Sequence, residues 1–264
     1  MQVGITQLLL PEPTTVEFIR TAADTGYEVV ELALRREGAL TLETTEAERQ
    51  RIVGAASDAG IGLVSMTLSH CTGNLLDSGP AQQTSIDETI TGLEMAASMG
   101  IGCTLHVLGK MHADLYYDDA YDNAVTSLRQ IAPTAERLNV TVAYEFTWNG
   151  FAFSPLEIRR LLDEVGSPRV GFYFDPGNMA VFHCPHHWVR ILGPRIRMVH
   201  LKDWRGNALN GTWPPLLEGA VDFAAMNRHL REDAGYDGPM ISEVPPDTAP
   251  LAATAEAIRR IIAM

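Results

Sequence analysis

The stretch that decides the fold reads VTVAYEF at residues 140–146, SPLEIRRLLDEVG at 154–166 and VGFYFDPGN at 170–178. Its first and third parts are apolar at nearly every position and rich in β-branched or aromatic residues, which is typical of parallel strands buried on both faces. The middle part has apolar side chains three and four positions apart, and Ser154 and Glu157 stand at capping-box spacing at its start. The stretch therefore predicts a strand, a helix and a second strand.

The same pattern repeats along the whole chain. Apolar segments with helical spacing separate the strand-length runs, so that eight units of about 33 residues fill the 264 residues. Parallel strands need helical crossovers, and eight such units close a barrel. We therefore predict a single (β/α)8 TIM-barrel domain over residues 1–264. The expected strands are Val3–Leu8, Glu28–Leu32, Gly62–Leu68, Cys103–Leu108, Val140–Phe146, Val170–Phe174, Ile196–Leu201 and Met240–Val244.

An open, doubly wound sheet is the alternative fold. It requires a glycine-rich phosphate loop after an early strand. The glycine pairs at residues 60–62 and 100–102 each precede a strand, and they fit the ends of helices better. A second helix start is expected at Thr45, which has Glu48 three residues later.

Composition narrows the classes of function. The formal charge is −13 and the pI is near 5.0, which disfavours binding to nucleic acid or to an anionic membrane surface. The chain carries three cysteines without a short paired spacing, no apolar run of bilayer length and no signal-peptide pattern at its start. We expect a cytoplasmic protein, and a homo-oligomer is compatible with these features.

Ionisable side chains gather at the carboxyl ends of the predicted strands, where a TIM barrel has its active site. Carboxylate and imidazole donors without a thiolate suit a hard divalent ion such as Mn²⁺, Mg²⁺ or Co²⁺. A lone carboxylate in such a position would be a helix cap or half of an ion pair, but four consecutive strands end in this way. The four residues are Glu145, Asp175, His200 and Glu243.

Three motifs carry a resemblance to a known family: Asp175-Pro176-Gly177-Asn178, the run from Val199 to Trp204, and the run from Leu217 to Phe223. The chain resembles the xylose-isomerase-like TIM barrel superfamily, which includes sugar phosphate isomerases and epimerases, ketose 3-epimerases and endonuclease IV. Similarity to the ketose 3-epimerases implies one Mn²⁺-type ion held by Glu145, Asp175, His200 and Glu243. It also implies that Glu145 and Glu243 are the catalytic acid and base.

The expected chemistry is proton transfer. A cation that chelates the carbonyl and a neighbouring hydroxyl of a sugar acidifies the adjacent C–H, and two carboxylates can remove and return the proton. We therefore predict a divalent-metal-dependent isomerase or epimerase of a small sugar or keto-sugar. The alternative is a lyase on the same scaffold, either a dehydratase of a keto-inositol or an eliminase acting on a 3-oxo-glycoside.

The sequence departs from the ketose 3-epimerase pattern where those enzymes contact their substrate. Phe151 stands at the position of a substrate-binding Glu, and Asn178 stands at the position of a His. Gly206 stands at the position of an Arg, with Arg205 one place away. These departures put a free ketohexose substrate in doubt. The residues expected to bind substrate are His106, Asn178, Lys202 and Arg205.

Several of these residues also have structural interpretations. Period-two alternation points Lys202 into the barrel mouth beside His200, where a salt bridge to Glu145 or Glu243 is as well supported as a substrate contact. His106 can instead be a satisfied core histidine, and Glu31 is expected to form a structural ion pair with Arg35 or Arg36. Three tryptophans are expected in loops over the mouth, where they either stack on a sugar or pack on one another: Trp148, Trp204 and Trp213.

Two further classes of protein are alternatives to a sugar enzyme. An endonuclease IV-like enzyme needs more histidines and aspartates than this chain offers, and its substrate is disfavoured by the net charge. A non-catalytic barrel would purify without metal. No evident Arg/Lys cluster follows the seventh and eighth predicted strands, which favours an unphosphorylated sugar as the partner.

Overall fold

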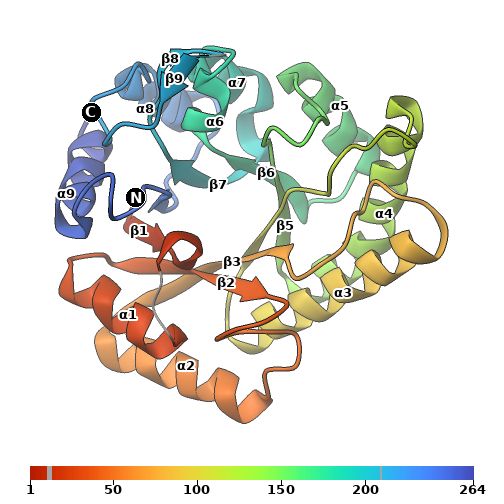
Figure 1. Cartoon of the computed structure of the whole chain (residues 1–264), viewed down its shortest axis with the longest axis horizontal. Helices are drawn as coiled ribbons and strands as arrows, with labels where there is room; N and C mark the ends of the chain where they lie inside the picture. The colour runs from red at the N-terminus through yellow and green to blue at the C-terminus, as the bar shows by residue number, and fades with distance from the viewer. Residues whose placement is uncertain (11–13, 209) are drawn as a thin grey trace.

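The computed structural model describes residues 1–10, 14–208 and 210–264, and its centre is a closed barrel of parallel strands (Figure 1). Around the barrel the strands follow the order β1-β10-β7-β6-β5-β4-β3-β2. The eight strands are β1 (Val3–Thr6), β2 (Val29–Arg35), β3 (Gly62–His70), β4 (Cys103–His106), β5 (Thr141–Glu145), β6 (Val170–Phe174), β7 (Ile196–Leu201) and β10 (Met240–Ser242). The predicted (β/α)8 barrel is confirmed.

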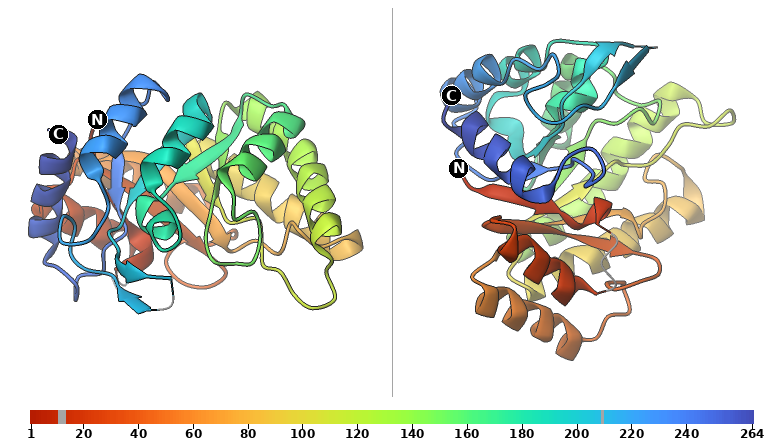
Figure 2. Two further views of the ribbon diagram at one scale, coloured as in Figure 1. Left: turned by 90° about the horizontal axis from the view of Figure 1, so that it is seen from above. Right: turned by 60° about the vertical axis from the view of Figure 1, so that its left-hand side comes forward.

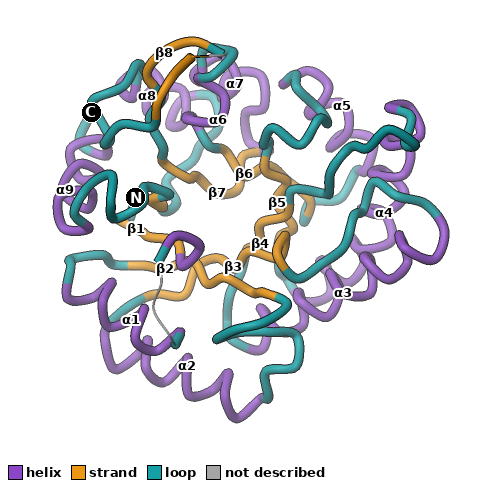
Figure 3. Tube along the Cα trace, viewed as in Figure 1, coloured by secondary structure: helices purple, strands orange, loops and turns teal. Residues whose placement is uncertain are grey.

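Helices surround the barrel as an outer layer, and loops join them to the strands (Figure 3). They are α1 (Thr15–Asp24), α2 (Glu46–Ala59), α3 (Gly79–Ser98), α4 (Tyr117–Leu138), α5 (Pro155–Val165), α6 (Pro176–Ala180), α7 (Pro185–Leu192), α8 (Phe223–Glu232) and α9 (Leu251–Ile262). After β7 a two-stranded hairpin, β8 (Arg205–Asn207) with β9 (Asn210–Thr212), projects beyond the body of the barrel (Figure 2). None of the described helices combines the length and hydropathy of a membrane-spanning segment.

Several strands end elsewhere than predicted. β1 stops at Thr6, because the Thr6 hydroxyl accepts from the Leu8 N–H and starts a 3₁₀ turn over Gln7–Leu9. β4 ends at His106 and β10 at Ser242, both two residues earlier than expected, whereas β2 and β3 run further. These are boundary errors, because the register of neighbouring strands decides where pairing stops.

The predicted helix starts are confirmed in one case and partly wrong in another. Thr45 and Glu48 form a complete capping box, and α2 ends at Gly60 with φ 68°, a conformation that glycine adopts without strain. Ser154 caps α5 through the Leu156 N–H, but Glu157 does not return a bond to it. The Glu157 carboxylate accepts from the Tyr117 hydroxyl at 2.6 Å, and this tertiary contact replaces the expected box.

Alternate residues of each strand face two different environments. A small cluster inside the barrel contains Ala143, Tyr173, Met198 and Ile241, whereas their chain neighbours pack outward against the helices. Since side chains alternate with period two, the residue two positions beyond each of these four also faces the barrel axis. Those residues are the four predicted ligands, and they lie at the carboxyl ends of their strands: Glu145, Asp175, His200 and Glu243.

Candidate metal centre

Four side chains from adjacent strands meet at the barrel mouth. One ligand atom from each of Glu145, Asp175, His200 and Glu243 lies within 4.8 Å of the others. His200 and Asp175 are fully buried, and the Glu243 side chain is 16% exposed, so the group opens toward solvent on the Glu243 side. Three carboxylates and one imidazole form a donor set that suits one hard divalent cation.

The Asp-Pro-Gly-Asn motif positions Asp175. One carboxylate oxygen, Oδ1, accepts from the backbone N–H groups of Gly177 and Asn178 and so caps α6. A Cβ on Gly177 would lie 2.4 Å from the Cβ of Lys202, so only glycine lets α6 start this close to the end of β7. The cap fixes the Asp175 side chain through Oδ1 and leaves its second oxygen, Oδ2, outside the cap.

That second oxygen, Asp175 Oδ2, tests whether a cation fits. It is fully buried, and the Lys202 ammonium lies 2.9 Å from it. One ammonium faces the three carboxylates of Glu145, Asp175 and Glu243, so negative charge remains that a divalent cation would offset. The residues present therefore fit a divalent cation.

Glu31 holds His200 from the side opposite the ligand group. The expected ion pair of Glu31 with Arg35 or Arg36 is wrong: Glu31 is fully buried, and its Oε1 lies 2.8 Å from His200 Nε2. Arg35 donates to the Leu8 carbonyl, and Arg36 pairs with Glu88. Sequence reasoning missed this contact. The signal was present in the period-two pattern of β2, which turns Val29, Glu31 and Ala33 inward.

Lys202 neutralises two of the carboxylates. Its Nζ lies 2.5 Å from Glu243 Oε2 and 2.9 Å from Asp175 Oδ2. Burial acts to lower the pKa of Lys202, but the carboxylates of Asp175 and Glu243 outweigh it and hold the pKa above its usual range. The ion pair that the sequence left open against a substrate contact is thus present with Glu243, and Asp175 also takes part in it.

The two glutamates experience different electrostatic surroundings. Burial raises the pKa of Glu145 to about 7 against the opposing effect of His200. Burial acts in the same direction on Glu243, but the Lys202 ammonium and His200 hold its pKa well below the usual range. Two carboxyl groups whose pKa values are driven apart are suited to exchange roles as proton donor and acceptor.

A cavity of about 300 Å³ adjoins the ligand group at Glu243. Lys202 and Asp203 line the same cavity. Trp148 and Trp213 form one wall, stacked with ring centroids 5.1 Å apart, and Trp213 also contacts Trp204 at 4.6 Å. The expected position of these tryptophans over the mouth agrees with the structure, and they pack on one another while leaving a face on the cavity.

Asp203 gives the His-Leu-Lys-Asp motif a structural role. Its carboxylate accepts from the backbone N–H groups of Trp204, Gly219 and Val221. A Cβ on Gly219 would lie 2.1 Å from Asp203 Oδ1, so the glycine of the Leu-Glu-Gly motif is required for this approach. The two motifs are joined here and hold the loop that carries Trp213 beside the cavity.

The structure does not bring His106 to the ligand group. Leu105 faces the barrel interior, so His106, one residue later, points outward toward α3. Its Nε2 lies 2.8 Å from Thr72 Oγ1, and its Nδ1 accepts from the Leu108 N–H at 2.8 Å. Burial lowers the pKa of His106 to about 4, so the ring is neutral. This placement is that of a satisfied core histidine, outside the described residues that line the cavity.

Asn178 and Arg205 are the remaining residues expected to bind substrate, and neither is among the described residues that line the cavity. Asn178 is buried, and its Nδ2 donates to the Phe146 carbonyl at 3.1 Å and to Glu145 Oε1 at 3.4 Å, so it positions Glu145. Arg205 lies exposed on β8 of the projecting hairpin, outside the set of residues that line the cavity. Sequence spacing placed Arg205 near the mouth, but the hairpin turns outward after Trp204.

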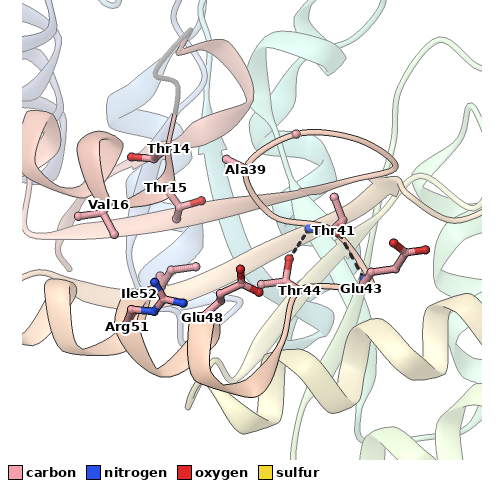
Figure 4. Close-up of a pocket in the computed structure, with 11 residues that line it drawn as sticks. Thr14, Thr15, Val16, Ala39, Thr41, Glu43, Thr44, Glu48, Arg51 and Ile52 are labelled. Carbon is pink, nitrogen blue, oxygen red and sulfur yellow. Dashed lines mark hydrogen bonds between the residues drawn. The ribbon is translucent and has the colours of Figure 1, made fainter.

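A second cavity, of about 400 Å³, lies on the flank of the barrel between the start of α1, the segment after β2, and α2 (Figure 4). Its walls are mainly threonine side chains and the exposed part of α2, where Glu48 is already engaged in the capping box. The four ligand residues are absent from the described residues that line this cavity.

Comparison with known proteins agrees with the barrel fold. The family model described as xylose isomerase-like TIM barrel matches residues 19–264. The chain belongs to this family. The resemblance predicted from the three motifs is confirmed.

Two curated relatives match part of the chain. The chain is similar to the 3-oxo-isoapionate decarboxylase of Pectobacterium atrosepticum, with 27% identity over 42% of each chain. It is also similar to a probable L-ribulose-5-phosphate 3-epimerase of Mycoplasma pneumoniae, with 24% identity over 39% of this chain and 35% of the relative. The matched segments thus span less than half of either curated relative.

A solved structure resembles the whole chain. The D-psicose 3-epimerase from Clostridium cellulolyticum H10, with D-tagatose, superposes with a TM-score of 0.82 over 99% of both chains, at 15% identity. At this identity the likeness shows the shared fold alone.

Proposed function

We propose that this chain is a divalent-cation-dependent isomerase or epimerase that acts on a small sugar or keto-sugar. The observation that carries the proposal is the convergence of Glu145, Asp175, His200 and Glu243 within 4.8 Å, beside a cavity with an aromatic wall. Mn²⁺ is the expected ion, and Mg²⁺ or Co²⁺ suits the same donors.

The four side chains would hold the cation, and Glu145 and Glu243 would also move the proton. When bound, the cation supplies electrostatic stabilisation to a substrate carbonyl and so acidifies the adjacent C–H. β7 and β6 lie between β10 and β5 in the barrel, so the two glutamates reach the group from opposite flanks. One carboxylate removes the proton from the carbon beside the carbonyl. The other returns it to the opposite face of that carbon, or to the neighbouring carbon.

The remaining polar groups keep this pair in place. Asn178 holds Glu145, and Lys202 holds Glu243 through an ion pair. Lys202 also lines the cavity, where its ammonium can donate to a substrate oxygen. Trp148 and Trp213 present apolar faces of the kind on which sugar rings stack.

The cavity favours an uncharged sugar. Among the described residues that line it, Lys202 is the only cation, and two carboxylates already neutralise it. Asp247 and Glu243 add negative charge to the same walls. A sugar phosphate would meet net repulsion here, because phosphate recognition needs cationic or backbone N–H donors.

A lyase is the second candidate. The similarity to a 3-oxo-isoapionate decarboxylase supports it, because decarboxylation beside a chelated carbonyl proceeds through the same type of enolate as proton transfer. Dehydration of a keto-inositol and elimination from a 3-oxo-glycoside need the same electrostatic support.

The test is a screen of unphosphorylated keto-sugars, 3-oxo-glycosides and one sugar phosphate in D₂O with Mg²⁺, followed by NMR. We expect deuterium to enter the carbon beside the carbonyl of an unphosphorylated sugar, together with an epimer or isomer as product. An unsaturated or decarboxylated product would establish the lyase instead. Absence of exchange on every compound, with Glu145→Gln as the blank, would remove both candidates.

A further inference from the structure

The buried carboxylate of Glu31 accepts several hydrogen bonds from other strands of the barrel. Three hydroxyl groups converge on its carboxylate: Thr6 at 2.8 Å on Oε1, and Ser65 at 2.7 Å and Tyr173 at 2.6 Å on Oε2. His200 Nε2 lies 2.8 Å from Oε1. Both oxygens of this fully buried side chain are therefore saturated by donors from four other strands.

This donor pattern fixes the protonation of the histidine. A carboxylate that accepts from three hydroxyls acts as an acceptor toward the ring as well, so His200 Nε2 carries a hydrogen. The other ring nitrogen, Nδ1, lies 3.3 Å from Glu145 Oε1 and 3.4 Å from Glu243 Oε2. Nδ1 is thus the nitrogen that faces the ligand group, and it can bind a cation once that cation has displaced its proton.

Tyr173 contacts both members of the Glu31–His200 pair. Its hydroxyl donates to Glu31 Oε2 at 2.6 Å. Tyr173 also packs its ring against His200, with centroids 4.5 Å apart, so the imidazole is restrained in its plane as well as at Nε2.

We infer that Glu31 is a positioning residue of the metal centre: it fixes the Nε2–H tautomer and the orientation of His200, so that Nδ1 is presented to the cation. This inference rests on the proposed function for the presence of a cation. A carboxylate behind a ligating histidine raises the basicity of the ligand and orients it, and loss of such a group lowers metal affinity about 10- to 100-fold.

The test compares Mn²⁺ affinity in the whole chain and three variants, with the EPR signal of free Mn²⁺ as the readout. Glu31→Gln keeps the shape of the side chain and removes its charge, and we expect its affinity to fall about 10- to 100-fold. His200→Ala removes the ligand itself, and we expect it to show the largest loss of Mn²⁺ affinity. His106→Asn is the matched control, because His106 is equally buried in the same barrel but contacts neither Glu31 nor the ligand group.

A spectroscopic readout separates positioning from loss of stability. In wild-type protein with Mn²⁺ we expect ¹⁴N coupling from His200 in electron spin-echo spectra, and we expect Glu31→Gln to weaken it. A general loosening of the barrel would lower affinity equally in His106→Asn. Affinity and ¹⁴N coupling in Glu31→Gln that match the wild type would overturn the inference.

A measurement on the unmutated chain serves if Glu31→Gln fails to fold. With Mg²⁺ bound, long-range ¹H–¹⁵N spectra of His200 should show the Nε2–H tautomer, and an Nδ1–H tautomer would overturn the inference. Wild-type protein that binds Mn²⁺ through His200 but turns over no sugar would remove the proposed function and leave this inference standing. Wild-type protein that binds neither Mn²⁺ nor Mg²⁺ would remove both.

Discussion

Two strands of this barrel, β7 and β4, each have a buried histidine near the carboxyl end, and the two histidines have different surroundings. At the end of β7, His200 faces the barrel axis and meets carboxylates on both ring nitrogens. At the end of β4, His106 faces the helical layer and meets hydroxyls and a backbone N–H. The first environment raises the pKa of His200 well above its usual value despite burial, and the second lowers the pKa of His106 to about 4.

The difference comes from a shift of one residue. Met198 and His200 lie on the same side of β7, whereas Leu105 and His106 lie on opposite sides of β4. A residue type at a strand end therefore carries information about function only together with the side of the strand on which it lies. The following four predictions test this contrast, from the largest expected effect to the smallest.

Removal of the cation should lower the rate of turnover more than any substitution. After dialysis against EDTA we expect turnover to fall to about a thousandth or less, because the electrostatic support is worth several kcal/mol. Mn²⁺ should restore it. The measurement is the initial rate on the keto-sugar identified by deuterium exchange, before and after addition of the ion. Full activity in protein shown to be metal-free would contradict the assignment of Glu145, Asp175, His200 and Glu243 to a metal centre.

Substitution of either glutamate should have the second largest effect on the rate. In Glu145→Gln and Glu243→Gln we expect the rate to fall about 100- to 10⁴-fold, because each variant loses one partner of the proton transfer. Circular dichroism should be unchanged, since glutamine keeps the shape of the side chain. Rates at saturating Mn²⁺ separate lost chemistry from weakened ion binding. Wild-type rates in either variant would remove its role as acid or base.

The affinity for Mn²⁺ should depend on pH. Glu145, with a pKa of about 7, and His200, with a raised pKa, both carry protons that the cation must displace. Below these pKa values the protonated forms compete with the ion, so affinity should rise with pH, by up to about tenfold per pH unit for each proton displaced. Titrations at pH 6, 7 and 8 check this prediction. A flat profile would contradict the protonation states assigned to the site.

The smallest effect on catalysis is expected at the β4 end. His106→Asn should change the rate less than about threefold while lowering the free energy of unfolding by about 1–3 kcal/mol, because it leaves buried hydrogen-bonding groups around Thr72 and Leu108 without their partner. Denaturant unfolding and steady-state kinetics on the same sample give both values. A large loss of rate with unchanged stability would reinstate His106 as a substrate residue.

The barrel could be predicted from local patterns because each strand–helix unit carries its own sequence signals. Apolar runs of strand length, capping residues such as Thr45, and glycines such as Gly60 act over a few residues, and the structure confirms them. The convergence of Glu145, Asp175, His200 and Glu243 was predictable for a related reason. Parallel strands bring their carboxyl ends to one rim, so acidic residues at successive strand ends must lie near one another.

The predictions that the structure did not match depended on contacts between distant segments. The sequence favoured nearby arginines as partners of Glu31, yet Tyr173 and His200, more than a hundred residues away, take that place. Arg205 stands at a suitable spacing, but it follows the hairpin out of the mouth. Local spacing cannot show how a loop leaves the barrel.

The sequence by itself determined the repeating units, the chemical nature of the rim and the four residues that meet there, because these follow from short-range pattern and from the polarity of parallel strands. Only the tertiary structure decided that His106 faces outward, that Lys202 pairs with two carboxylates and that Glu31 lies behind His200. Barrel closure brings β2, β6 and β7 within hydrogen-bond distance across the interior, and no local signal in any one strand encodes which partners meet there.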